Sequence, residues 1–116
     1  MAKESFVWEA HGVCTNATTF DLAFRPGPHR KRVALDRLAA VDDTTSPTLL
    51  ILGVKHGATE VRLESWSAPG AGVVKAMTSR VFVWSDWLPF VRVTGAGVGD
   101  QIALYAFGYL TDANED

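Results

Sequence analysis

The segment that most limits the fold is residues 80–110, RVFVWSDWLPFVRVTGAGVGDQIALYAFGYL, the densest apolar stretch of the chain. It is rich in Val, Phe and Trp, which suit the pleated surface of a β-strand. Pro89 lacks a backbone N–H, so residues 85–89 are predicted to form a turn or a change of sheet. The three glycines in residues 94–100 predict a tight turn before the last strand. We expect the rest of the chain to be sheet that covers these strands.

The last predicted strand, residues 101–110, is apolar on both faces. Ile102 and Leu104 fall on one face, and Tyr105 and Phe107 fall on the other. A strand of this kind is typical of a sandwich interior or of a contact between subunits.

The remaining chain contains further short strand-like segments separated by turn residues. Residues 60–66 alternate, with Val61 and Leu63 opposite Glu60, Arg62 and Trp66, which predicts one packed face and one wet face. Residues 33–41 favour a strand, although Leu35 and Leu38 at a spacing of three also suit a helix. The total is about eight strands, which predicts an all-β antiparallel sandwich or barrel. The other segments are residues 5–13, 18–24, 48–54 and 73–78.

Composition indicates one globular domain spanning residues 1–116. The hydrophobic fraction is 47%, the charged fraction is 21% and the net charge is −2, so no overall field attracts nucleic acid. The single cysteine, Cys14, excludes an intrachain disulfide. We expect no signal peptide and no membrane span, and therefore synthesis in a cytoplasm. The acidic tail, residues 111–116, is predicted to be mobile.

Residues that could carry chemistry do not form a recognisable catalytic pattern. His11, His29 and His56 are far apart in turn-like contexts and have no H-x-H spacing, which disfavours a metal site. Cys14 lies three residues after His11, so on a strand the two side chains point to opposite faces, and Cys14 is predicted to be a buried structural residue. The glycines of residues 94–100 precede a strand rather than a helix, which disfavours phosphate binding. We expect no enzyme activity and no cofactor.

The strongest local charge lies in residues 25–32, RPGPHRKR, where two prolines and a glycine predict a loop. This basic loop is either a solvated turn or a contact for an anionic partner surface. A protein partner is favoured over nucleic acid because the loop has no aromatic platforms. The candidate contact residues are Arg25, His29, Arg30, Lys31 and Arg32.

The chain has four tryptophans, of which Trp84 and Trp87 flank a predicted turn. Most tryptophans belong to the core. Aromatic side chains beside a loop also serve subunit interfaces or sugar recognition, so Trp84 and Trp87 are candidate partner contacts, and Trp66 is a further candidate for stacking on a glycan.

The segments VALDRLAAVDDTTSPTLLILGVKHGATEVRLESW and VRVTGAGVGDQIALYAFGYL resemble the minor virion proteins of tailed bacteriophages. In such proteins a strand similar to TLLILGV follows a polar turn, and the final strand follows a turn similar to GAGVGD. The resemblance covers residues 33–110.

This resemblance implies a jelly-roll-like β-sandwich that forms a homo-oligomer, commonly a homotrimer, and binds the major capsid protein or another virion protein. The implied role is a capsid decoration or cement protein, or a head-fibre protein, which is a structural protein located in the virion. A carbohydrate-binding or adhesin module is the alternative from the residues themselves. A small barrel enzyme is disfavoured because no paired carboxylates or metal cluster is evident.

Overall fold

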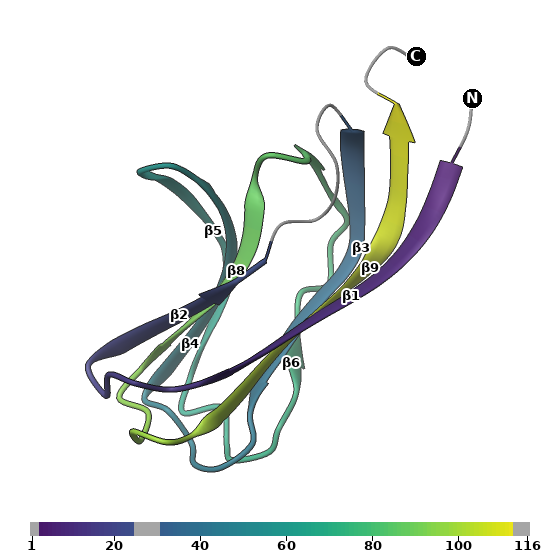
Figure 1. Cartoon of the computed structure of the whole chain (residues 1–116). Helices are drawn as coiled ribbons and strands as arrows, with labels where there is room; N and C mark the ends of the chain where they lie inside the picture. The colour runs from purple at the N-terminus through teal and green to yellow at the C-terminus, as the bar shows by residue number, and fades with distance from the viewer. Residues whose placement is uncertain (1–2, 25–30, 113–116) are drawn as a thin grey trace.

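The computed structural model describes residues 3–24 and 31–112, and the side chains of residues 5–24 and 31–111. The described residues form nine strands in two antiparallel sheets that pack face to face as a sandwich (Figure 1). The prediction of an all-β sandwich is confirmed. The first sheet contains β1 (Lys3–Val13), β9 (Gln101–Asp112), β3 (Lys31–Asp42), β6 (Lys75–Ala76) and β7 (Val81–Trp84). The second contains β2 (Thr19–Ala23), β8 (Leu88–Thr94), β4 (Leu49–His56) and β5 (Thr59–Ser67).

The strand pairing is that of one long hairpin that has been rolled up. The β4–β5 hairpin is its tip, and the pairs that follow outward along the chain are β3 with β6 and β7, then β2 with β8, then β1 with β9. Successive pairs fall alternately in the two sheets. This arrangement is the jelly-roll form of the antiparallel sandwich.

The core fills the space between the sheets. Leu50 and Leu52 on β4, Val91 and Val93 on β8, and Leu104 on β9 are almost completely buried. Alternate residues on each strand point inward, as the period of a strand requires. The outer face of β9 differs, because Phe107 remains 38% exposed. The second apolar face of β9 is therefore only partly covered, because Ala103 on the same face is buried.

Residues 33–41 form a strand, within β3, rather than a helix. Leu35 and Leu38 both point into the core because a β-bulge at Asp36 adds one residue between them. The bulge therefore explains why Leu35 and Leu38, at a spacing of three that also suits a helix, share one face of a strand. Gly108 lies opposite, where an added Cβ would be 1.8 Å from the carbonyl oxygen of Ala34, so glycine is required there.

A second bulge changes the faces of β5. Leu52 pairs with Glu64 while Gly53 pairs with Arg62, so Leu63 is the extra residue. Beyond this point Trp66 pairs with Leu50 and packs against the core. The predicted placement of Trp66 on the wet face with Glu60 and Arg62 is therefore wrong.

Three predicted boundaries also change. The loop predicted for residues 25–32 is shorter, because Lys31 and Arg32 already belong to β3, while residues 25–30 lie outside the described residues. Thr111 and Asp112 pair with β3 and are not part of a mobile tail, and residues 113–116 lie outside the described part. Pro89 lies within β8 opposite Val54, so the turn covers residues 85–87 only.

The strand predicted for residues 73–78 is reduced to β6, which has two residues. No helix in the described part of the chain is long and apolar enough to span a membrane.

Candidate binding surface

Two aromatic side chains project from β7 onto the outer face of the first sheet. Phe82 is 67% exposed and Trp84 is 46% exposed. They lie two residues apart on one strand and therefore share one face, whereas Val81 and Val83 point toward the core between them. Large aromatic residues so exposed are unusual away from binding surfaces.

Arginines from the neighbouring segments lie over these rings. Arg32 is paired with Trp84 across β3 and β7, and its guanidinium carbon is 5.5 Å from the centre of the Trp84 ring. Arg80 lies 5.9 Å from the Phe82 ring and 5.5 Å from the Tyr109 ring. These are cation–π distances. We call Arg32, Arg80, Phe82, Trp84 and Tyr109 the aromatic–arginine patch.

Asp36 holds Arg80 in place through an ion pair. Asp36 is the bulged residue of β3, so the bulge that sets the core register also supplies the carboxylate on the outer face. The patch thus combines three strands, β3, β7 and β9, and its arginine side chains are oriented by neighbouring groups.

An apolar groove of about 300 Å³ lies on the inner side of β7. It is lined by Val54 of β4, Val61 of β5, and Phe82 and Trp84 of β7. Trp87 also lines the groove and stacks on His56 with 5.5 Å between the ring centres. His56 Nε2 in turn lies 3.1 Å from Asp86 Oδ2.

The residues predicted as partner contacts are only partly brought together. Arg32 and Trp84 are adjacent, although they are far apart in the sequence. The backbone N–H of Lys31 donates to the Ser85 hydroxyl at 3.2 Å, which attaches the start of β3 to the turn after β7. Trp87 lies in the groove on the other side of β7. Arg25, His29 and Arg30 lie outside the described residues.

Three members of the patch were missed in the sequence, namely Arg80, Phe82 and Tyr109. The alternation of Phe82 and Trp84 was the available signal, because two bulky aromatics on one face of a short strand next to predicted turns favour exposure. The same alternation places Arg80, two residues before Phe82, on that face. Tyr109 gave no such signal, because only the pairing of β3 with both β7 and β9 brings it near Phe82.

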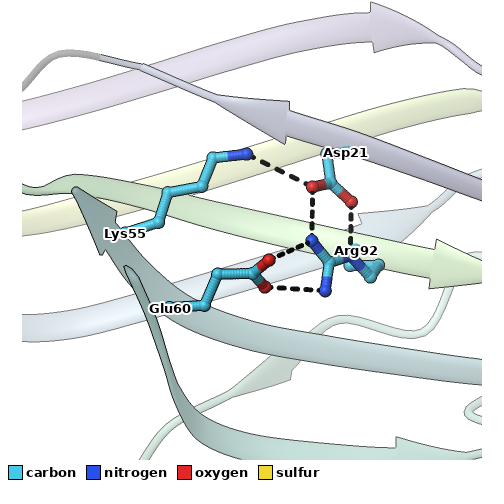
Figure 2. Close-up of polar contacts among 4 residues, drawn as sticks. All are labelled: Asp21, Lys55, Glu60 and Arg92. Atoms are coloured by element: carbon cyan, nitrogen blue, oxygen red, sulfur yellow. Dashed lines mark hydrogen bonds and ion pairs between the residues drawn. The ribbon is translucent and has the colours of Figure 1, made fainter. Parts of the chain in front are cut away.

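A separate polar cluster lies on the outer face of the second sheet (Figure 2). Arg92 on β8 donates two hydrogen bonds to Asp21 at 2.7 and 2.8 Å and also contacts Glu60 at 2.7 Å. Lys55 donates to Asp21 at 3.2 Å. Figure 2 shows that these four side chains come from four neighbouring strands and point toward one another.

The pKa values in this cluster follow from these contacts. Burial raises the pKa of Asp21, but the hydrogen bonds and charges of Arg92 and Lys55 outweigh burial and leave the pKa below its usual value of 3.8. The pKa of Glu60 is lowered by its hydrogen bond to Arg92, and the pKa of Arg92 is raised mainly by Asp21. Two positive and two negative charges neutralise one another, so the cluster indicates a structural role.

A buried carboxyl pair joins two loops at one end of the sandwich. Asp42 Oδ1 accepts hydrogen bonds from the backbone N–H groups of Thr44 and Thr45, at 3.0 and 3.2 Å, whereas its buried Oδ2 has no donor. The carboxyl group of Asp100 lies beside it and accepts hydrogen bonds from the Thr45 hydroxyl and from the Gly97 N–H. Burial, followed by the neighbouring Asp100, raises the pKa of Asp42.

Burial opposes ionisation of Asp100 as well, but its hydrogen bonds from Thr45, Asp42 and Gly97 leave its pKa lowered. The two carboxyl groups therefore differ in their ease of ionisation. As the pH rises, Asp100 is therefore expected to ionise before Asp42.

Cys14 is 1% exposed, as predicted for a structural cysteine. His11 is exposed and lies 3.5 Å from Glu9. Among the described residues, no group of three or more His, Cys, Asp and Glu side chains is arranged to hold a metal ion.

The fold and the patch together define a jelly-roll β-sandwich with an exposed aromatic surface on one sheet. Comparison with known proteins finds no family model and no curated protein sequence that matches the chain.

Proposed function

We propose that this protein is a non-enzymatic virion structural protein, of the capsid decoration or cement type, which binds the exterior of a shell built from a major capsid protein. The aromatic–arginine patch carries this proposal. Phe82 and Trp84 expose apolar area that folding leaves uncovered, and aromatic and arginine side chains are enriched at the centres of protein interfaces.

We infer the partner from the resemblance of residues 33–110 to minor virion proteins of tailed bacteriophages. A cement protein that binds only the assembled shell stabilises it by mass action, without any chemical step. Jelly-roll sandwiches suit this role because their strands form a stiff frame on which a flat binding face is held. Location in the virion and homo-oligomerisation belong to the same proposal.

The test is a pelleting experiment. Shells that lack the protein are prepared by deleting its coding sequence from the phage genome that carries it, and purified protein is added back. We expect the wild-type protein to sediment with the shells and a Phe82→Ser/Trp84→Ser double variant to remain in the supernatant. Val98→Ser is the control for loss of an exposed apolar side chain outside the patch, because Val98 is 71% exposed on the loop before β9. Equal sedimentation of the double variant and the wild-type protein contradicts the proposal.

A carbohydrate-binding module is the second candidate. The observation that favours it is the exposed indole of Trp84 beside Arg32, because aromatic faces stack on sugar rings while a guanidinium can donate to hydroxyl groups. A glycan panel read by tryptophan fluorescence separates the two candidates. A saturable change that disappears in Trp84→Ala supports glycan binding, whereas an unchanged signal removes this candidate.

A further inference from the structure

Strand β1 is the longest free edge of the sandwich. It pairs with β9 along all its eleven residues, and no strand among the described residues pairs with its other side (Figure 1). The other edge strands are shorter: β2 has five residues, β7 has four, β6 has two and β5 has nine. An uncovered edge of regular strand presents backbone groups that can pair with another strand.

Two hydrogen bonds show which residues of β1 present those groups. The N–H of Cys14, the next residue after β1, donates to the carbonyl oxygen of Asp100 at 2.9 Å, on the β9 side. On β9, the carbonyl oxygen of Gln101 accepts from the N–H of Asp43 at 2.9 Å. The backbone groups of Gln101 therefore point toward the β3 side and away from β1. Backbone groups alternate in direction along a strand, so the odd-numbered residues of β1 point their N–H and C=O groups toward the free edge.

The same odd-numbered residues carry exposed side chains. Val7 is 78% exposed, which makes it the most exposed of the large hydrophobic residues described, and Ser5, Glu9, His11 and Val13 are exposed as well. The edge has no proline, and its register with β9 is unbroken from Lys3 to Val13. Proteins that must remain monomeric commonly interrupt such an edge with proline, a bulge or inward-pointing charge.

We propose that β1 binds a second copy of this chain, with the two β1 strands antiparallel about a two-fold axis at Val7, so that the first sheet continues across both copies. This proposal goes beyond the proposed function, because it assigns the contact surface and the two-copy symmetry of self-association, and it uses the β1 edge of the sheet rather than the β7 edge that carries Phe82 and Trp84.

The register about Val7 follows from side-chain chemistry. It places Val7 of one copy opposite Val7 of the other, and cross-strand pairs of β-branched residues are favourable. It also places Glu9 of one copy opposite Ser5 of the other. An axis at residue 9 would instead oppose two glutamates, and like charges directly opposite each other are destabilising. The contact is isologous, because both copies contribute the same strand edge, so the assembly is complete at two copies.

The first test is the absolute mass in solution, measured by light scattering across a range of concentrations. We expect twice the mass of one chain for the wild-type protein. Val7→Pro removes an N–H that does not bond to β9, and proline is tolerated on an edge strand, so this variant should stay folded and become monomeric. Val7→Lys should also be monomeric. Val7→Thr is the matched control, because it keeps both the N–H and the branched side chain, and it should remain a dimer.

The second test measures the register by disulfide formation under mild oxidation, with the wild-type protein as the control for the buried Cys14. Val7→Cys should cross-link with itself, because directly opposed residues have Cα atoms about 5.5 Å apart, within the range of a disulfide. Ser5→Cys and Glu9→Cys should cross-link only when the two variants are mixed. In this register each lies about 14 Å from its own counterpart, since four residues along the strand add to the strand spacing, and this is too far for a disulfide.

A wild-type protein that is monomeric at every concentration overturns the proposal. The β1 edge would then be available to pair with a strand of a different protein. A trimer overturns it as well, as does a dimer that persists in both Val7→Pro and Val7→Lys. Self cross-linking of Ser5→Cys or Glu9→Cys rejects the axis at Val7. Shell binding that is retained in Val7→Lys shows that the proposed function stands independently of self-association.

Discussion

One buried oxygen atom, Oδ2 of Asp42, has no hydrogen-bond donor in the described structure. It belongs to a carboxyl pair in which Asp100 is favoured to ionise and Asp42 to keep its proton. A raised pKa means that the folded state binds the proton of Asp42 more tightly than the unfolded state does. The contribution of Asp42 to stability therefore falls as the pH rises from 3.8 through its higher pKa in the folded protein.

We predict that Asp42→Asn raises the free energy of unfolding at pH 7 by about 1–2 kcal/mol, because the amide keeps the Oδ1 acceptor and supplies a permanent donor to Asp100. The gain should shrink at pH 3.8, where folded Asp42 carries its own proton. Urea unfolding at the two pH values measures the difference. Asp43→Asn, at the exposed neighbouring position, is the control and should change little. A lower stability of Asp42→Asn at pH 7 would show that the amide does not donate a favourable hydrogen bond to Asp100.

At the scale of strands, Arg92 connects the second sheet across its width. It pairs with Asp21 on β2 and with Glu60 on β5, while β4 contributes Lys55 (Figure 2). The Arg92 side chain is largely buried, so these ion pairs are less screened than fully exposed ones. Asp21 has a lowered pKa, so its contribution to stability is present above pH 3.8 and is lost as the pH falls through the lower value in the folded protein.

We predict that Arg92→Lys lowers the free energy of unfolding by about 1–3 kcal/mol at pH 7, because an ammonium group cannot make the paired contacts of a guanidinium with two carboxylates. The loss should be smaller in acid, once Asp21 is protonated. Arg62→Lys, at an exposed position of β5, is the matched control. Thermal unfolding of both variants at low and high salt is the measurement, and an equal, negligible effect of the two would mean that the cluster contributes nothing to stability.

At the scale of the whole molecule, the rolled hairpin pairs the first strand with the last. Lys3 lies opposite Thr111 and Val13 lies opposite Gln101, so most of the chain separates the partners in sequence. Closing such long loops reduces chain entropy before the contacts form, which slows folding.

We predict that the protein refolds in milliseconds to seconds, the range of all-β sandwiches, and not in microseconds. Stopped-flow tryptophan fluorescence after dilution from urea is the measurement. With Trp84 and Trp87 replaced by Phe, Trp8 on β1 and Trp66 on β5 report on the two sheets. In this background the same single rate is expected in the Trp8→Phe and Trp66→Phe variants if the sandwich folds cooperatively. Two separate rates would indicate that the sheets form independently.

Much of the strand content was predictable because it depends on local composition. The stretches around Val91 and Leu104 have the β-branched and aromatic residues that a pleated surface favours, and turn residues separate them. The bulges were not predictable, because almost any residue can be the extra one. The bulge at Asp36 produced the helix-like spacing of Leu35 and Leu38 in β3. The bulge at Leu63 places Trp66 on the packed face of β5.

The sequence by itself determined the all-β class, the burial of Cys14 and the exposure of polar turns, because each depends on the chemistry of neighbouring residues along the chain. Only the tertiary structure decided which strands pair, and with them the aromatic–arginine patch. Arg32 reaches Trp84 and Arg80 reaches Tyr109 because β7 and β9 both pair with β3. Backbone hydrogen bonds between strands are the same for every sequence, so pairing partners are selected by the packing of the whole core.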